Sequence, residues 1–152
     1  RTLRRELRKS ACEVSIQDCR HHLVRDRESS QRLFRLRPDI VVLKGGLPLC
    51  VVDTKWKRLS PDERKLGIAQ GDLYQMLAYA ESYDCGAILL IYPWDPAGGE
   101  HLSLRRRLVF HGGKRATVSI GELSLQDLSG VGSRLADLLE GAGINLAEEV
   151  GA

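Results

Sequence analysis

The chain has 152 residues, of which 43% are hydrophobic and 28% are charged, and its formal net charge is +3 at pH 7. This length allows one domain with a hydrophobic core and a small appendage, and the composition is ordinary for a soluble globular protein. No apolar run approaches the roughly 18 residues of a membrane helix, so the sequence excludes a helical membrane protein and predicts no membrane partner.

The start of the chain, RTLRRELRK, is basic and amphipathic and predicts the last turns of a helix. No apolar segment follows it, so this stretch is not a signal peptide. Because the chain does not begin with Met and opens inside a helical pattern, we interpret it as an N-terminally truncated fragment of a longer protein. Its four cysteines show no C-x-x-C spacing, which predicts reduced thiols and a cytoplasmic location.

Several strands follow the basic start. Alternating or continuous apolar residues predict strands over residues 13–18, 21–25, 33–37, 39–43 and 49–55, the third of which leads into the fourth. Ser60-Pro61-Asp62-Glu63 has the form of a capping box and predicts a short turn ahead of the main helix. Gly67 and Gly71 weaken a continuous helix, so we expect the main helix over residues 68–83.

The second half of the chain alternates strands and helices. The apolar run at residues 86–92, GAILLIY, predicts a strand that is buried on both faces, which requires a parallel or mixed sheet covered by helices. A hairpin is predicted over residues 102–110 and 115–120, and a final helix over residues 128–139. This order predicts an α/β fold with a mixed central sheet flanked by helices.

Charged residues stand at the ends of two apolar strands in RPDIVVLKGGLPLCVVDTK, residues 37–55. Asp39 begins the first strand directly after Pro38, and Asp53 and Lys55 end the second. Because side chains alternate across a strand, Asp53 and Lys55 point to the same face.

The turn between these strands decides whether Asp39 joins that face. A two-residue Gly45-Gly46 loop places Asp39 opposite Val52, on the wrong face. A three-residue loop that ends at Leu47 places Asp39 opposite Asp53. Three-residue hairpins with Gly in the left-handed position are common, so we predict the second register, or a bulge with the same effect.

Two carboxylates beside an ammonium group predict a cation site. Like charges this close are costly unless something positive lies between them, and the usual occupant is a hard divalent cation such as Mg²⁺. The alternative is that Asp39 caps a turn while Asp53 and Lys55 end a solvated strand, because Asp-x-Lys is a common tripeptide. The thirteen residues between the two aspartates, and the apolar strands with charges at their ends, favour the site.

On the predicted main helix, Asp72, Gln75 and Tyr79 share one face at i, i+3 and i+7. Taken alone, this pattern is also that of the edge of an amphipathic helix. Basic clusters elsewhere are compatible with a polyanion such as DNA, although a single cluster more often marks a solvated face. The candidates for DNA contact are Arg37, Lys57 and Arg58.

Four stretches resemble a known family. Pro38-Asp39 followed by Asp53-Thr54-Lys55 resembles the PD-(D/E)xK nuclease signature, and Gln75-Met-Leu-Ala-Tyr79 resembles the Gln-x-x-x-Tyr motif of its RecB-like branch. Four longer sequence segments resemble the McrC family, the nuclease subunits of the McrBC modification-dependent restriction system. They are LRPDIVVL, VVDTKWKRL, DLYQMLAYA and AILLIYP. The similarity covers residues 33–93 well and the flanks only loosely.

The resemblance implies a restriction-endonuclease-like fold and Mg²⁺-dependent DNA cleavage, with Mn²⁺ as a substitute. The residues that it implies for catalysis are Asp39, Asp53, Lys55, Gln75 and Tyr79, and those for the metal are Asp39, Asp53 and the carbonyl of Thr54. In this family Lys55 would orient the attacking water or stabilise the charge of the phosphorane, while Gln75 and Tyr79 support the site. The resemblance also implies a partner, an McrB-like AAA+ GTPase that reads 5-methylcytosine and translocates DNA.

Other functions fit parts of the same pattern. A RecB-like or Cas4-like exonuclease has the same fold but a different nuclease activity. The Cas4-like form requires a cysteine cluster that this chain lacks. A non-catalytic nucleic-acid-binding module of the same fold is a further alternative. The presence of Asp39, Asp53 and Lys55 argues against it, because a module that had lost catalysis would be expected to lose such residues.

The sequence predicts two parts, a nuclease domain at residues 1–122 and a C-terminal helical segment at residues 123–152. Residues 128–139 match a helix-hairpin-helix pattern, which binds phosphates through backbone N–H groups at a Gly-rich turn. The alternative is an ordinary amphipathic helix that packs on the sheet.

Overall fold

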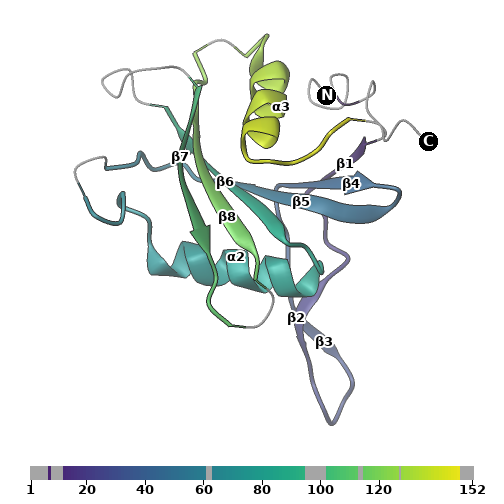
Figure 1. The fold of residues 1–152 in the computed structure, drawn as a ribbon. Helices are drawn as coiled ribbons and strands as arrows, with labels where there is room; N and C mark the ends of the chain where they lie inside the picture. The colour runs from purple at the N-terminus through teal and green to yellow at the C-terminus, as the bar shows by residue number, and fades with distance from the viewer. Residues whose placement is uncertain are drawn as a thin grey trace.

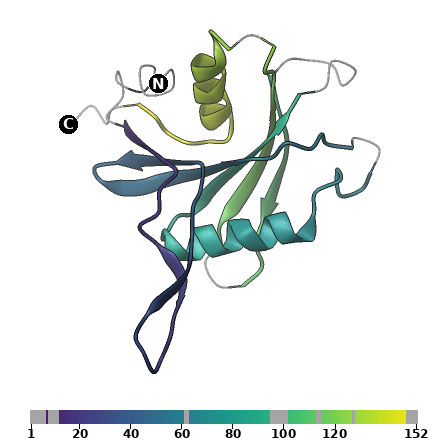
Figure 2. The same ribbon diagram turned by 180° about the vertical axis from the view of Figure 1, so that it is seen from behind.

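The computed structural model describes residues 7, 12–60, 63–94, 102–112, 115–126 and 128–147, and its centre is a six-stranded sheet (Figures 1 and 2). In order across the sheet the strands are β1 (Cys12–Ile16), β4 (Ile40–Lys44), β5 (Leu47–Thr54), β6 (Ala87–Pro93), β8 (Thr117–Leu123) and β7 (Leu102–Val109). Strands β5, β6 and β8 are parallel, and the remaining neighbours are antiparallel. The predicted α/β fold with a mixed sheet is therefore confirmed.

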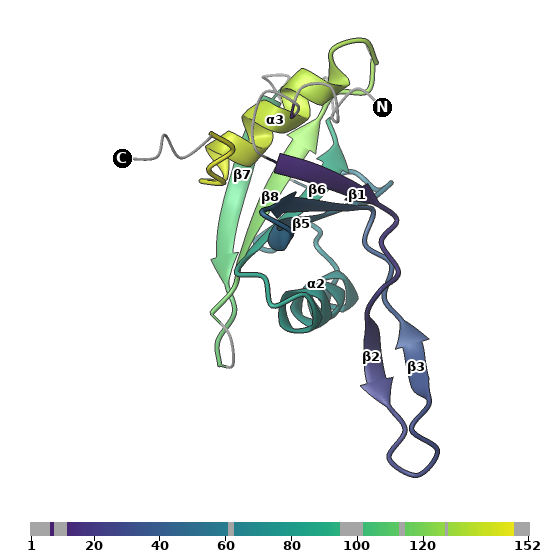
Figure 3. The ribbon, with the colours of Figure 1, turned by 90° about the vertical axis from the view of Figure 1, so that its right-hand side faces the viewer.

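Two helices, α2 (Gln70–Ser82) and α3 (Val131–Gly141), cover opposite faces of the sheet (Figures 1 and 3). Along β6, Ile88 and Leu90 belong to the core on the α2 side, whereas Leu89 and Ile91 belong to the core on the α3 side. This alternation confirms that the apolar run of β6 is buried on both faces. Two hydrophobic cores, separated by the sheet, hold the fold together.

The boundaries of the elements agree closely with the sequence patterns. Helix α2 lies within the predicted range, and β7 and β8 form the predicted hairpin. Before α2, the N–H of Glu63 donates to the carbonyl of Ser60 (3.0 Å) in a turn that ends with Leu66 and Gly67 at φ of 55° and 69°. Pro61 and Asp62 of the predicted capping box lie outside the described residues, as does the predicted N-terminal helix apart from position 7.

One predicted strand lies elsewhere than expected. Residues 33–37 do not lead into β4, because β3 (Arg32–Arg35) pairs instead with β2 (His22–Arg25) in a separate two-stranded sheet. Phe34 has a φ of 56°, and Pro38 has no N–H to donate to a ladder, so neither residue fits a continuous strand. This ribbon extends away from the body beyond α2 (Figure 3).

The C-terminal helix packs on the sheet through Leu135, Leu138 and Leu139. The N-cap position is Gly130, one residue before a first turn in which Gly132 is buried. This packing is the amphipathic alternative noted for residues 128–139, while the division of the chain at residue 122 stays a prediction. Neither described helix combines the length and the apolar character needed to cross a membrane.

Candidate active site

The register of β4 and β5 places two carboxylates side by side. Ile40 pairs with Val52, and continuing this register by one residue sets Asp39 opposite Asp53. The turn itself is a two-residue Gly45-Gly46 turn in which both residues have positive φ. A register shift after Val42 then has the effect of a third loop residue. The bulge alternative of the predicted register is confirmed.

Asp39 is fixed by the end of the neighbouring strand. Its Oδ2 accepts hydrogen bonds from the N–H (2.9 Å) and the hydroxyl (2.5 Å) of Thr54, and its own carbonyl accepts from the N–H of Gln17 (2.9 Å). The N–H of Lys55 donates to the carbonyl of Ile91 (2.8 Å), which extends the parallel ladder by one residue. The backbone around the carboxylates is thus held on both sides.

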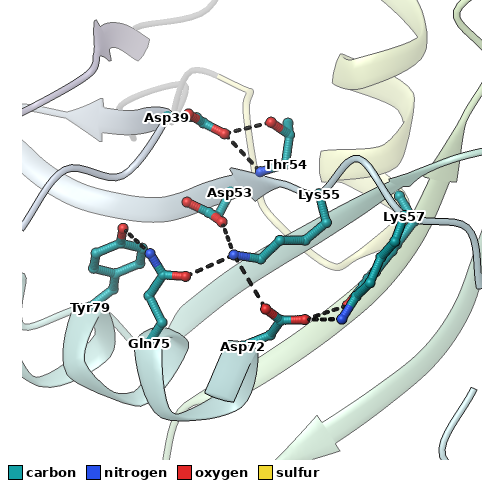
Figure 4. Close-up of polar contacts among 9 residues, drawn as sticks. Asp39, Asp53, Thr54, Lys55, Lys57, Asp72, Gln75 and Tyr79 are labelled. Carbon is teal, nitrogen blue, oxygen red and sulfur yellow. Dashed lines mark hydrogen bonds and ion pairs between the residues drawn. The ribbon is translucent and has the colours of Figure 1, made fainter. Parts of the chain in front are cut away.

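Lys55 connects the strand end to helix α2 (Figure 4). Its Nζ lies 2.8 Å from Oδ2 of Asp53 and donates to Oε1 of Gln75 (2.7 Å). The amide nitrogen of Gln75 in turn donates to the hydroxyl of Tyr79 (2.8 Å). The structure therefore brings together Asp53, Lys55, Gln75 and Tyr79 in one chain of polar contacts, with Asp39 across the hairpin.

Asp72 is a member of this cluster that the predicted residue set omitted. Its carboxylate lies 3.6 Å from Nζ of Lys55 and 2.6 Å from Nζ of Lys57, and it accepts a hydrogen bond from the hydroxyl of Tyr92 (3.4 Å). Its position one turn before Gln75 on the same helix face was the signal in the sequence. Lys57, a predicted DNA contact, forms an ion pair within the site.

The electrostatics of the site show an excess of negative charge. Burial raises the pKa of Asp53; the hydrogen bond and charge of Lys55 oppose this, and the charges of Asp39 and Asp72 add to it. Burial also acts to raise the pKa of Asp72, but the hydrogen bond from Lys57 and the nearby ammonium charges hold it below its ordinary value. Burial, with the charge of Asp53, raises the pKa of Tyr79 to about 12, so this hydroxyl keeps its proton at neutral pH.

The oxygen donors fit a hard divalent cation. Within the described residues, no group of three or more His, Cys, Asp and Glu side chains forms a ready-made metal site. Asp39 and Asp53, however, present two carboxylates from adjacent strands, and the repulsion between them contributes to the raised pKa of Asp53. Carboxylate and carbonyl oxygens are the ligands that Mg²⁺ prefers, and a cation between the two carboxylates would relieve this repulsion.

An apolar hollow of about 110 Å³ lies beside the ammonium-bearing strand end. Its lining includes Lys55, Trp56, Ile91, Tyr92 and Leu123. Trp56 is 86% exposed although it directly follows Lys55. The remaining predicted DNA contacts, at positions 37 and 58, are exposed side chains on the segments that flank the site.

The fold and the site together define a mixed α/β domain with an aspartate–lysine centre at the ends of adjacent strands. The family model described as "McrBC 5-methylcytosine restriction system component" matches residues 1–93. The chain belongs to this family, which confirms the resemblance stated from its motifs.

A solved structure supports the same fold. It is described as a refined half-complex from a tetradecameric assembly of Thermococcus gammatolerans McrB AAA+ hexamers with bound McrC. One of its chains is similar to this one with a TM-score of 0.59 and 15% sequence identity, over 92% of this chain and 30% of that chain. The present chain thus spans less than a third of that protein's length. No curated protein matches the chain.

Proposed function

We propose that the chain is the nuclease part of a McrBC-type restriction system and hydrolyses phosphodiester bonds of DNA with Mg²⁺. The observation that supports this most is Lys55, whose ammonium group is held between Asp53 and Gln75 while Asp39 stands opposite. We propose a restriction-endonuclease-like fold for the domain on the basis of this arrangement. Family membership and the neighbour with bound McrC agree with it.

The chemistry follows from the charge of the substrate. A phosphodiester resists attack by hydroxide because it is anionic, so the site must supply positive charge where negative charge develops. Asp39 and Asp53, with the carbonyl of Thr54, would hold Mg²⁺, which lowers the pKa of a bound water and stabilises charge on the phosphoryl oxygens.

Lys55 has the remaining direct role in the proposed reaction. Its ammonium group would orient the attacking water or stabilise the charge that develops on the phosphoryl oxygens. Gln75 fixes the position of this ammonium, and Tyr79 fixes the amide of Gln75 so that its oxygen faces the lysine. Asp72 adds a second carboxylate that holds Lys55 and Lys57 in the site.

The proposed partner is an McrB-like AAA+ GTPase that delivers DNA containing 5-methylcytosine. The similar structure from Thermococcus gammatolerans is an assembly of McrB AAA+ hexamers with bound McrC, and this supports the proposal for the present chain. The Cas4-like alternative requires a cysteine cluster, and the four cysteines of this chain show no C-x-x-C spacing.

The test is nicking of methylated supercoiled plasmid in Mg²⁺ or Mn²⁺, with the cognate GTPase present. We expect Asp53→Asn and Lys55→Met to lose about a hundredfold or more in rate, as for loss of a group that stabilises charge in the transition state. The matched controls Asp137→Asn and Lys65→Met change the same residue types at exposed positions and should cleave normally.

Each outcome has a distinct meaning. Full cleavage by both site variants, folded by circular dichroism, would contradict the site. Cleavage of linear but not circular DNA would indicate an exonuclease of the RecB-like kind. DNA binding without cleavage by the wild type would support the non-catalytic module instead.

A further inference from the structure

The two-stranded ribbon has no role in the site described above. We call residues 19–37 the arm; it contains strands β2 and β3 and leaves the body between β1 and β4 (Figures 1 and 3). A two-stranded ribbon contributes little stability by itself, so the fold alone gives no reason for its length. The arm is therefore a candidate contact surface.

The base of the arm is firmly attached to the body near helix α2. The buried carboxylate of Asp18 accepts hydrogen bonds from the hydroxyl of Tyr83 (3.0 Å) and the hydroxyl of Ser15 (2.9 Å). The ring of His21 packs on that of Tyr83 with 4.2 Å between centroids. These contacts orient the arm relative to the active site, and its last residue lies two positions before Asp39.

The arm is strongly basic. It carries six arginines against two carboxylates, at positions 26 and 28. The carboxylate at position 26 accepts hydrogen bonds from the N–H groups of residues 28 and 29 in the arm's own turn. Within the described part of the chain, the guanidinium groups of Arg25, Arg32 and Arg35 lie within ion-pair distance of no carboxylate.

These charges face both sides of the ribbon. Arg25 lies directly opposite Arg32, and Arg35 lies opposite His22. On β2, which has no residue at positive φ, His22 and Arg25 are three residues apart and therefore point to opposite faces, and each shares its face with the arginine opposite it on β3. A flat partner surface would cover one face only, whereas a groove between two charged walls would meet both.

The Arg25–Arg32 pair itself points to an anion. Like charges directly opposite each other destabilise a ribbon, and an anion between them removes this cost. Both arginines line one shallow hollow of about 410 Å³, together with Arg20, whose guanidinium group pairs with Asp18 (2.8 Å). Phe34, 72% exposed at a φ of 56°, adds a bulky apolar side chain held in a conformation that such residues rarely adopt.

We propose that the arm binds duplex DNA by lying in the major groove next to the cleavage site, with Arg25, Arg32 and Arg35 on the phosphates of its two walls. The major groove admits a two-stranded β-ribbon, and arginine is well suited to phosphate. This inference rests on the proposed nuclease function, because it takes DNA as the substrate. It assigns the duplex contact to a surface outside the catalytic cluster.

The test measures binding of a short labelled duplex in EDTA over a series of salt concentrations, so that no cleavage occurs. The variant with Arg25→Gln, Arg32→Gln and Arg35→Gln should bind more weakly, and the slope of log affinity against log salt should fall by about 2 to 3. The control with Arg64→Gln, Lys65→Gln and Arg115→Gln removes the same charge from exposed positions outside the arm. It should lower the slope by less than about 1.

A conservative variant separates charge from folding. Replacing the three arm arginines with lysine keeps the positive charge and should restore most of the salt slope. Equal binding by the arm and control variants would overturn the proposal, as would the absence of any duplex binding by the wild type. Normal DNA binding with loss of assembly with the AAA+ partner would identify the arm as a protein contact and would also overturn it.

The catalytic variant Asp53→Asn distinguishes this inference from the proposed function. It should bind the duplex like the wild type while cleavage is lost. If the wild type binds through the arm but does not cleave, the nuclease proposal fails and the arm proposal stands. If cleavage is normal and the arm substitutions leave duplex binding unchanged, only the arm proposal fails.

Discussion

Asp53 and Asp72 contact the same ammonium group of Lys55, yet their pKa values shift in opposite directions. Asp53 stands on a strand end that is buried in the fold, so burial dominates and its pKa is raised. Asp72 lies on the helix between two ammonium groups, and its pKa is lowered although burial opposes this. A carboxylate with a raised pKa costs stability at neutral pH, and one with a lowered pKa supplies it.

We therefore expect opposite effects of two matched substitutions at neutral pH. The Asp53 carboxyl group contributes stability below pH 3.8, and this stability is lost as pH rises through its raised folded pKa. Asp53→Asn should therefore raise the free energy of unfolding at neutral pH. Asp72→Asn should lower that free energy by about 1 kcal/mol, the upper end for exposed pairs, because its side chain is only 18% exposed. The stability that the Asp72 carboxylate supplies is present above pH 3.8 and is lost as pH falls through its lowered folded pKa.

Urea unfolding at neutral pH and at a pH below 3.8 measures both effects. The two differences from the wild type should have opposite signs at neutral pH. In acid the difference for Asp53→Asn should shrink below pH 3.8, and that for Asp72→Asn only as pH falls through the lower folded pKa of Asp72. Equal destabilisation by both variants would contradict the electrostatic account of the site.

At this scale the sequence predicted the charged residues on the hairpin and, through the family resemblance, the support from Gln75 and Tyr79, but not the ion pairs with Asp72. Asp39, Asp53 and Lys55 stood at the ends of apolar strands, where charge is unexpected. Lys57 and Asp72 form their ion pair only because the end of β5 meets the first turn of α2, and no local pattern specifies that meeting. The ion pair is a property of the tertiary fold.

The hairpin of β4 and β5 is the element that holds the two carboxylates in register. The sequence predicted a three-residue loop or a bulge with the same effect, and the structure uses a two-residue turn with a bulge. Pro48 gave a local signal for the bulge, since it has no N–H and proline inside a sheet is confined to edges and bulges. The bulge keeps Asp39 on the face of Asp53, because a slip by one residue moves side chains to the other face.

Substitution of the turn glycine tests this element. Gly46 has a φ of 78°, so Gly46→Ala should lower the free energy of unfolding by about 1 kcal/mol or more, the cost of the left-handed conformation. Gly86→Ala is the matched control, because Gly86 lacks a positive φ and nothing lies within 4 Å of an added Cβ. It should be neutral or slightly stabilising in urea unfolding. Equal loss in both variants would show that the turn does not require glycine.

The arm shows where local patterns fail at the level of elements. Residues 33–37 alternate apolar and basic side chains as a strand of the main sheet would, and the prediction that they lead into β4 was wrong. The alternation reflects pairing with β2 instead, and all four residues of β3 are exposed. A strand pattern predicts extended backbone but does not identify its partner.

The whole molecule depends on two cores, one on each face of the sheet. The core on the α2 side positions Gln75 and Tyr79, and the core on the α3 side contains the strand residues Val42, Val52 and Leu89. Strands β4 and β5 contribute to both, so loss of either core exposes the strands that carry the carboxylates. This arrangement bears on the predicted division of the chain at residue 122.

A chain that ends at Ser124 tests that division. It lacks α3, whose buried Leu135, Leu138 and Leu139 together contribute roughly 5–9 kcal/mol at about 1.5–3 kcal/mol per buried side chain. Domains of this size are stable by only about 5–15 kcal/mol, so we expect the shortened chain to show no cooperative unfolding transition.

Single substitutions in the whole chain provide the matched comparison for this truncation. Leu138→Ala should lower the free energy of unfolding by about 2–5 kcal/mol, because Leu138 is 2% exposed. Leu128→Ala, at a side chain that is 66% exposed, should change it by less than about 0.5 kcal/mol. Urea unfolding followed by circular dichroism measures all three proteins. Cooperative unfolding of the shortened chain at the wild-type midpoint would show instead that residues 1–124 fold without α3, and that the carboxylate strands need only the core on the α2 side.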